Sequence, residues 1–217
     1  MEKAKDIIVY TCITNGKNKL EKFLPEEGVR YICFTNEKLE QPKETPWELL
    51  PLEWEHESDP RRTSRYHKIN SGLVLPTHDW SVWLDGNIRP MVRQKEVIEW
   101  MNNRHFATIP HMLRNCLYDE MVACMDRKKE SKDMIEKIFN RYKTQGVPPN
   151  LGLHATGVLI RRFFPSVVSF CTEWWKEVAK YSKRDQLSFD YIRWKRNFEV
   201  ATLKSDWYKL NKHQHME

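Results

Sequence analysis

An aspartate and an asparagine flank a glycine directly after an apolar run that contains two tryptophans. Asp85, Gly86 and Asn87 follow Leu84, the last residue of that run. Carboxylate and amide oxygens suit a hard cation such as Mn²⁺ or Mg²⁺, and a glycine lets a diphosphate come close to the backbone. The same residue types also form tight turns, so a plain turn is the alternative interpretation.

A basic stretch, residues 59–68 with the sequence DPRRTSRYHK, precedes this apolar run. At helical spacing Arg61, Arg65 and Lys68 lie on one face. Three cations on one side match a nucleoside diphosphate, or the negative charge of one that departs during a reaction. A solvated basic face is the alternative.

A third informative stretch covers residues 182–191, with the sequence SKRDQLSFDY. Ser182 and Asp185 have the spacing of a capping box, in which the carboxylate reaches back to the serine amide at the start of a helix. In a functional interpretation, the helix dipole keeps Asp185 ionised, and its carboxylate points to a sugar as a base, a hydroxyl anchor or a transition-state stabiliser. The two roles are compatible.

Two histidine-bearing segments, residues 110–120 and 150–157, could form the walls of an acceptor pocket. The candidate pocket residues are His111, Arg114, Glu120, His154 and Thr156. A lone histidine is more often a structural hydrogen-bonding residue, which is the alternative here. His213 and His215 lie in a polar tail, where disorder is the default, although such a tail can fold back to complete the coordination of a metal.

Short apolar runs predict the strands that must position these residues. They cover residues 7–12, 29–34, 80–84, 106–110 and 156–160. Helical periodicity appears over residues 63–75, 95–103, 131–143 and 182–194, whereas residues 41–54, with three prolines, are expected to be irregular. Strands that alternate with helices favour an α/β domain whose central sheet is mostly parallel. Ligands of such sheets bind beyond the carboxyl ends of the strands, so we expect the polar residues at 14–15, 35–36 and 85–87 to meet at one edge.

The composition excludes several classes of protein. A chain of 217 residues with net charge +6 and 40% hydrophobic residues describes one globular domain. Its seven glycines form neither a dinucleotide fingerprint nor a P-loop, so side chains, a metal or a helix N-terminus must bind any phosphate. Five cysteines without a C-x-x-C pair indicate neither a disulfide framework nor a zinc site. Since no signal peptide or membrane span is recognisable either, we expect a cytoplasmic chain.

Five motifs, in this order, resemble those of a GT-A-type glycosyltransferase. Within that fold they resemble the family of plant and microbial glycosyltransferases typified by a plant mucilage-related enzyme. The motifs are D-P-R-R-T-S-R-Y-x-K, W-x-D-G-N-I, H-x-x-R-x-C-x-Y-x-E, G-x-x-x-x-G-V-L-I-R and S-x-R-D-Q-L-S-F. The resemblance extends over nearly the whole chain, from about Tyr10 to Tyr191.

The resemblance implies a single GT-A-like (Rossmann-like) domain over residues 1–217. Residues 1–90 would form the half that binds the nucleotide sugar, and residues 91–217 the half that binds the acceptor. The implied reaction is the metal-dependent transfer of a hexose or deoxyhexose from a nucleoside-diphosphate sugar, with UDP preferred, to a hydroxyl of a glycan or glycoprotein. The resemblance also points to further domains in a longer parent protein of viral origin, acting in the host cytoplasm.

The resemblance also implies roles for single residues. Asp85 and Asn87 stand where the family binds the divalent ion and the ribose or diphosphate, although Asn87 replaces the usual second aspartate and should weaken metal binding. The other residues implied to contact the donor nucleotide are Thr11, Asn15, Arg62, Arg65, Lys68, Leu84 and Gly86. Asp185 and Gln186 match an acidic motif near the transferred sugar. An inverting enzyme needs a carboxylate base, for which Asp185, Asp190 or Glu120 could serve, and the sequence leaves inverting and retaining chemistry open.

Two other functions stay open. A pI of about 9.0 and interleaved aromatic residues suit a nucleic-acid-binding module. Because 30 acidic residues are interspersed through the chain, a continuous phosphate-binding surface is less favoured, and we expect no nucleic-acid partner. The atypical Asn87 leaves a second alternative, a domain that binds sugar nucleotide without catalysis.

Overall fold

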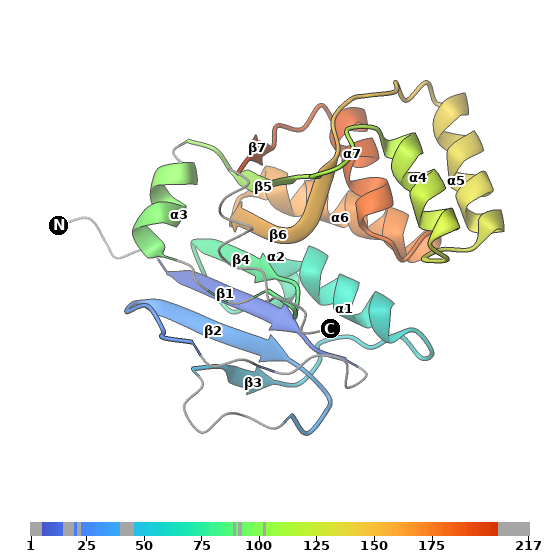
Figure 1. Ribbon diagram of the computed structural model, residues 1–217. Coiled ribbons are helices and arrows are strands. Elements are labelled where there is room, and N and C mark those ends of the chain that lie inside the picture. The colour runs from blue at the N-terminus through green and yellow to red at the C-terminus, as the bar shows by residue number, and fades with distance from the viewer. Residues whose placement is uncertain are drawn as a thin grey trace.

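A mixed β-sheet forms the centre of the protein (Figure 1). The computed structural model describes residues 6–14, 20, 23–39, 46–88, 90, 93–101 and 103–203. Within these residues seven strands lie in the order β3-β2-β1-β4-β6-β5-β7, and β6 is antiparallel to both of its neighbours while the other pairs are parallel. The strands are β1 (Ile7–Cys12), β2 (Val29–Phe34), β3 (Glu48–Leu50), β4 (Trp80–Leu84), β5 (Phe106–Pro110), β6 (His154–Arg162) and β7 (Ala201–Thr202). The predicted α/β fold with a mostly parallel sheet is therefore confirmed.

Helices cover both faces of this sheet (Figure 1). They are α1 (Pro60–Ile69), α2 (Ser71–Val74), α3 (Gln94–Met101), α4 (Leu117–Asp126), α5 (Lys132–Thr144), α6 (Pro165–Lys180) and α7 (Gln186–Lys195). The helix predicted over residues 63–75 is two helices, because α1 ends at Ile69 with Asn70 as its C-cap and α2 follows as a separate turn. Sequence periodicity missed α4 and α6, and the irregular segment predicted over residues 41–54 contains the short strand β3.

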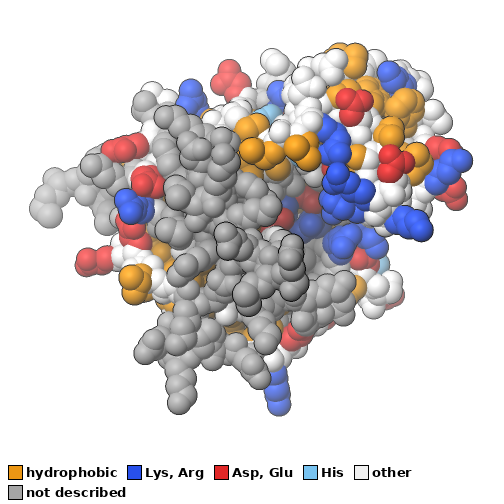
Figure 2. All heavy atoms as spheres, viewed as in Figure 1, with side chains coloured by type: hydrophobic (Ala, Val, Ile, Leu, Met, Phe, Trp, Pro, Cys, Tyr) orange, Lys and Arg blue, Asp and Glu red, His pale blue; other side chains and the backbone are white. Residues whose placement is uncertain are grey.

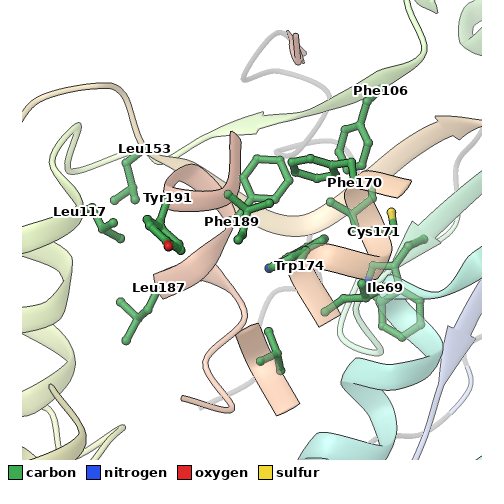
Figure 3. Close-up of a cluster of buried hydrophobic side chains, with 14 of the residues drawn as sticks. Ile69, Phe106, Leu117, Leu153, Phe170, Cys171, Trp174, Leu187, Phe189 and Tyr191 are labelled. Atoms are coloured by element: carbon green, nitrogen blue, oxygen red, sulfur yellow. The ribbon is translucent and has the colours of Figure 1, made fainter. Parts of the chain in front are cut away.

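The alternation of side chains along β1 explains why the sheet has two apolar faces. Ile8 and Tyr10 belong to one buried cluster, and Ile7 and Val9 belong to the other. The first cluster lies under α1, α4, α5, α6 and α7, and Figure 3 shows its aromatic centre, where side chains of α6 and α7 face one another. The second cluster includes residues of α3. Each apolar face is thus packed, and the site must lie at an edge of the sheet.

The carboxyl ends of the parallel strands meet at one edge of the sheet, as the sequence predicts. β1 lies between β2 and β4, and all three run in the same direction. Because β6 runs the opposite way, its first residues lie beside the end of β4, where Leu84 pairs with Val158 and the Asp85 N–H donates to the Gly157 carbonyl at 2.9 Å. Segments from distant parts of the chain therefore meet next to Asp85.

The described helices differ from membrane-spanning helices in length and in polarity. None of them combines the length and the apolar character that a membrane crossing requires.

Candidate functional site

Asp85 lies directly beyond the carboxyl end of β4 and is the exposed member of a charged cluster. Its side chain is 30% exposed, and its Oδ1 accepts a hydrogen bond of 2.8 Å from the Trp83 indole Nε1. A Cβ atom at Gly157 would lie 3.5 Å from Asp85 Oδ2, so the missing side chain at that position leaves room beside the carboxylate. The carboxylate is therefore oriented by a tryptophan and remains open on one side.

Helix α1 brings two cations to this carboxylate. Asp59 caps the helix by accepting hydrogen bonds from the N–H groups of Arg61 and Arg62, and Pro60 occupies its first turn. Lys68 Nζ lies 3.3 Å from Asp85 Oδ1, and Arg65 Nη1 lies 3.9 Å from the same oxygen. Two members of the predicted basic face, Arg65 and Lys68, face the end of β4, whereas Arg61 at the start of the helix is exposed.

Asp185 completes the cluster from the segment before α7. Its Oδ2 lies 2.6 Å from Lys68 Nζ and its Oδ1 lies 2.6 Å from Arg65 Nε. The Thr156 hydroxyl, at the start of β6, donates to Asp185 Oδ2 at 2.7 Å. The Asp185 side chain makes no capping hydrogen bond to α7, which begins at Gln186 and not at Ser182. The capping-box prediction is therefore wrong, because ion pairs with α1 engage the carboxylate.

Burial and charge shift the pKa values of this cluster in opposite directions. Burial alone would raise the pKa of Asp185, but Arg65 and Lys68 hold that pKa well below its usual range. Burial lowers the pKa of Lys68, and Asp185 and Asp85 offset part of that effect. Burial also disfavours the charged form of Arg65, yet the same two carboxylates raise its pKa. Two carboxylates thus balance two cations, and Asp85 is the most exposed member of the cluster.

A pocket of about 770 Å³ opens over this cluster. Its wall combines the start of α1, the end of β4 and two segments from later in the chain. The lining residues are Cys12, Thr14, His56, Ser58, Asp59, Pro60, Arg61, Ser64, Arg65, Trp83, Asp85, Gly86, Asn87, Lys128, Lys129 and Lys183. Figure 2 shows a hollow with acidic and basic side chains inside it, beside a band of Lys and Arg side chains on the side where α4 and α5 lie. A volume of this size suits a nucleotide-sized ligand.

Four of the described residues expected to contact the nucleotide do not line the pocket, and one of them, Lys68, lies buried beneath it. The Arg62 guanidinium donates to the carbonyls of Val178 and Tyr181, the latter at 2.7 Å, and so binds the end of α6. The Leu84 side chain is 1% exposed in the apolar core, and Thr11 is 2% exposed within β1. Arg61, which shares the helix face of Arg65, takes the place in the pocket that the resemblance implied for Arg62.

Asp190, one of the expected catalytic residues, lies apart from the pocket lining. Its Oδ1 lies 2.7 Å from both His154 Nδ1 and Arg193 Nε, and its Oδ2 accepts a 2.8 Å hydrogen bond from the His154 N–H. The side chain is fully buried. Gln186 donates to the His154 carbonyl at 3.2 Å and does not line the pocket either. These contacts attach α7 to the start of β6, which is a structural role.

The first predicted acceptor segment forms a cluster of its own at the end of β5. Arg114 Nη1 lies 2.8 Å from Glu120 Oε2, and His111 Nε2 lies 3.5 Å from the same oxygen. Burial lowers the pKa of His111, and Glu120 offsets part of that effect. None of these three residues lines the 770 Å³ pocket. Of the predicted acceptor residues, only Thr156 contacts the Asp85 and Asp185 cluster, through Asp185 and Lys68.

Two of the four predicted metal ligands lie in the part of the chain that the structure describes. Asp85 and Asn87 both line the pocket and offer oxygen donors. His213 and His215, together with the nucleotide-contact candidate Asn15, lie outside the described residues. In the part of the chain that the structure describes, no three His, Cys, Asp or Glu side chains are grouped as a metal site. A carboxylate and an amide nevertheless fit a divalent ion that also binds phosphate oxygens, since such ions often take only one or two carboxylates from the protein.

Sequence reasoning missed three lysines of the pocket wall. Lys128 and Lys129 follow the end of α4, and Lys183 lies between α6 and α7. The doubled lysine was visible in the sequence, but its place in the fold depends on α4, which periodicity did not reveal.

Comparisons with known proteins agree with this architecture. A sequence model of the TOD1/MUCI70 glycosyltransferase-like domain family matches residues 1–215. The chain is 26% identical over 235 residues to "Probable hexosyltransferase MUCI70" of Arabidopsis thaliana, covering 95% of this chain and 39% of that protein's length. Among solved structures, mouse xyloside xylosyltransferase 1 in its apo form superimposes with a TM-score of 0.52 at 11% identity, over 92% of this chain and 85% of the other. The apo bifunctional glycosyltransferase WbbM gives a TM-score of 0.54 at 10% identity, over 94% of this chain and 39% of the WbbM chain.

The two solved structures share the fold at low identity, and the family match covers nearly the whole chain. The chain spans less than half the length of its Arabidopsis relative. Together with the strand-end position of Asp85, these findings establish that the chain belongs to the TOD1/MUCI70 glycosyltransferase-like domain family.

Proposed function

We propose that this domain is a metal-dependent glycosyltransferase that uses a nucleoside-diphosphate sugar, with UDP as the preferred nucleotide. It would transfer a hexose or deoxyhexose to a hydroxyl of a glycan or glycoprotein. The observation that carries the proposal is the position of Asp85 beyond β4, paired with Lys68 and Arg65 at the floor of a basic pocket of about 770 Å³. Family membership supports the same reaction.

The reaction breaks the bond between the anomeric carbon and the diphosphate oxygen, and that oxygen keeps the electron pair. The acceptor oxygen forms a bond to the anomeric carbon, and a base accepts the proton of the acceptor hydroxyl. Negative charge therefore grows on the leaving diphosphate. Arg61 and Arg65 line the pocket, so they are in position before the reaction begins and would stabilise that charge as it develops.

A divalent ion would add positive charge at the same place. Asp85 and Asn87 would hold it with the diphosphate, and when bound it would lower the free energy of the departing anion. The single carboxylate of this pair makes the diphosphate an important part of the coordination, so metal and nucleotide should bind cooperatively.

Asp185 would act through its neighbours and not as the base. A good general base has a pKa near the working pH, whereas Arg65 and Lys68 hold the pKa of Asp185 far below that range. Its buried carboxylate instead fixes both cations under the pocket. We propose that Asp185 is a positioning residue for Arg65 and Lys68.

The two halves of the chain would divide the substrates. Cys12, Asp59, Arg61 and Asp85, from the first 90 residues, would bind the donor. Lys128, Lys129 and Lys183, from the second half, close the opposite wall, where an acceptor would approach.

Thermal denaturation with nucleotides and Mn²⁺ tests this function. A ligand at about a hundred times its Kd should stabilise the native state by roughly 2.7 kcal/mol. We expect UDP and UDP-hexoses to raise the Tm more with Mn²⁺ than without it, and we expect slow release of UDP from a suitable donor.

The Asp85→Ala variant should lose the Mn²⁺-dependent part of the shift and reduce donor turnover about a hundredfold. Glu136→Ala, which removes one carboxylate from the exposed surface of α5, is the control and should match the unmodified chain. If Asp85→Ala kept both the metal-dependent shift and the turnover, the proposed function would be wrong.

A further inference from the structure

Three lysines form one wall between two hollows of the protein. Lys128, Lys129 and Lys183 line the 770 Å³ pocket over Asp85, and they also line a neighbouring hollow of about 520 Å³. The second hollow is completed by Met125, Glu130, Ser131 and Lys132. We call these three lysines the lysine wall. A ligand that extends from the first hollow into the second must pass along it.

Polar contacts hold the lysine wall in place. The Ser182 hydroxyl donates to Glu130 Oε2 at 2.6 Å, which joins the segment after α4 to the segment before α7. Lys183 Nζ lies 3.4 Å from Asp59 Oδ2, the carboxylate that caps α1. These contacts join the two segments that carry the wall, and Lys183 links them to the helix that carries Arg61 and Arg65.

Lys128 has an unfavourable backbone conformation for a lysine. Its φ is 52°, and the N–H groups of Lys128 and Lys129 donate to the carbonyls of Met125 and Cys124 at 2.9 and 2.8 Å. These paired bonds form a Schellman motif, in which glycine is strongly favoured at the position that Lys128 occupies. The other non-glycine residues with positive φ in the described chain are all asparagines, which tolerate this conformation. Residues held in disfavoured backbone conformations cluster at functional sites, which makes Lys128 a candidate functional residue.

The pocket lining contains more cationic side chains than carboxylates that could neutralise them. The lining holds five cationic side chains and two carboxylates, and both carboxylates are already paired. Arg61 and Arg65 lie on the floor side and suit the diphosphate. In the described part of the chain, Lys128 and Lys129 have no carboxylate within ion-pair distance, so their charges are available to a second anion.

We propose that the acceptor carries an anionic group, a carboxylate or a phosphate ester, which the lysine wall binds while the acceptor hydroxyl faces the donor. This inference rests on the proposed function, because it assigns the substrate class of the same site. It also makes Lys128, Lys129 and Lys183 the residues that determine acceptor specificity.

A nucleic acid is a weaker fit for the same lysines. Asp59 and Asp85 also line the pocket, and they would repel a continuous track of phosphates. An isolated anionic group on a sugar can contact the wall and avoid both carboxylates. A short single-stranded RNA therefore serves as a competing probe.

Binding of three matched trisaccharides to the 217-residue chain, saturated with UDP and Mn²⁺, tests the proposal. The probes are maltotriose, the same trisaccharide oxidised to a uronate at its terminal C6, and its terminal 6-phosphate. We expect both acidic forms to bind at least about tenfold more tightly than the neutral one, since hydrogen bonds to charged groups are the strong ones. The comparison of uronate with phosphate then identifies which anion is preferred.

The double variant Lys128→Gly, Lys129→Ala should remove the preference for acidic probes and leave the affinity for UDP unchanged. Because glycine suits the backbone at position 128, the Tm of the double variant should equal or exceed that of the unmodified chain. Misfolding therefore cannot explain the loss of the preference for acidic probes. Lys176→Ala, which removes one lysine from the exposed surface of α6, is the control and should keep the preference.

Each contrary result has a separate meaning. Equal binding of acidic and neutral probes, or no binding of the acidic probes, overturns the anionic acceptor. A parallel loss of UDP affinity in the double variant overturns it by assigning the lysines to the donor, and tighter lysine-dependent binding of the RNA overturns it in favour of a nucleic acid. Absence of UDP binding in the unmodified chain contradicts the proposed function itself, and it is detected before any acceptor probe is added.

Discussion

Asp185 and Asp190 lie five positions apart around the start of α7, and both are buried and paired with cations, yet their surroundings differ. The partners of Asp185, Arg65 and Lys68, also lie beside Asp85 at the pocket floor. Asp190 pairs with Arg193 of its own helix and with a histidine at the start of β6. Burial and ion pairing alone therefore do not identify a functional carboxylate. What distinguishes Asp185 is that its partners extend to an open pocket.

The largest expected effect comes from changing each of these aspartates to asparagine. Breaking a buried ion pair leaves a charge without its partner, so Asp185→Asn and Asp190→Asn should each lower the free energy of unfolding by about 3 kcal/mol. Only Asp185→Asn should also weaken UDP binding, by roughly tenfold, because it frees Arg65 and Lys68 to move. Urea unfolding and calorimetric titration measure the two quantities. The comparison fails if Asp190→Asn weakens UDP binding as much as Asp185→Asn does.

A smaller effect follows from acidification. The folded-state pKa of Asp185 is lowered, so the stability that its carboxylate contributes is complete above the unfolded-state pKa of about 4 and is lost as the pH falls below that value. The difference in unfolding free energy between the unmodified chain and Asp185→Asn should therefore be constant near neutral pH and shrink below about pH 4. Urea unfolding at pH 7, 5 and 3.5 measures it. A difference that grew on acidification would contradict the assigned ion pairs.

The smallest expected effects distinguish two adjacent arginines of α1. Arg62→Met should cost about 1–2 kcal/mol of stability, since it removes hydrogen bonds to the last carbonyls of α6, and it should leave UDP affinity unchanged. Arg61→Met should barely change stability and should weaken UDP binding about fivefold, because this side chain lines the pocket. Thermal denaturation and calorimetric titration of both variants test the assignment. The opposite pattern would reverse the roles of the two residues.

The elements beside the site were predictable because local signals agreed. The buried run before Asp85 and the polar residues after it predict both the strand and its carboxyl end, and the structure confirms β4. Helical spacing alone also placed Arg61, Arg65 and Lys68 on one face, as observed. The family resemblance implied Arg62 together with Arg65 and Lys68, and the Arg62 side chain binds the end of α6.

Other features depend on contacts that no local pattern encodes. The spacing of Ser182 and Asp185 is typical of a helix cap, but ion pairs with α1 engage the carboxylate more strongly. The position of Lys128 in the pocket wall depends on its own left-handed backbone conformation just after α4. It also depends on the contact of the following segment with Ser182, between α6 and α7. The family and the fold were predicted and are confirmed, whereas the roles of single site residues stay predictions.

The position of β4 in the sheet also determines when the site can form. One neighbour of β4 is β1, near the start of the chain, and the other is the antiparallel β6, which ends at Arg162. Asp85 therefore acquires its surroundings only after segments far apart in the sequence have paired, and such non-local pairing is slow. During synthesis on the ribosome, a nascent chain that stops before β6 contains Asp85 and the whole basic stretch but lacks Thr156 and Asp185. We expect nucleotide binding to appear only at the end of folding.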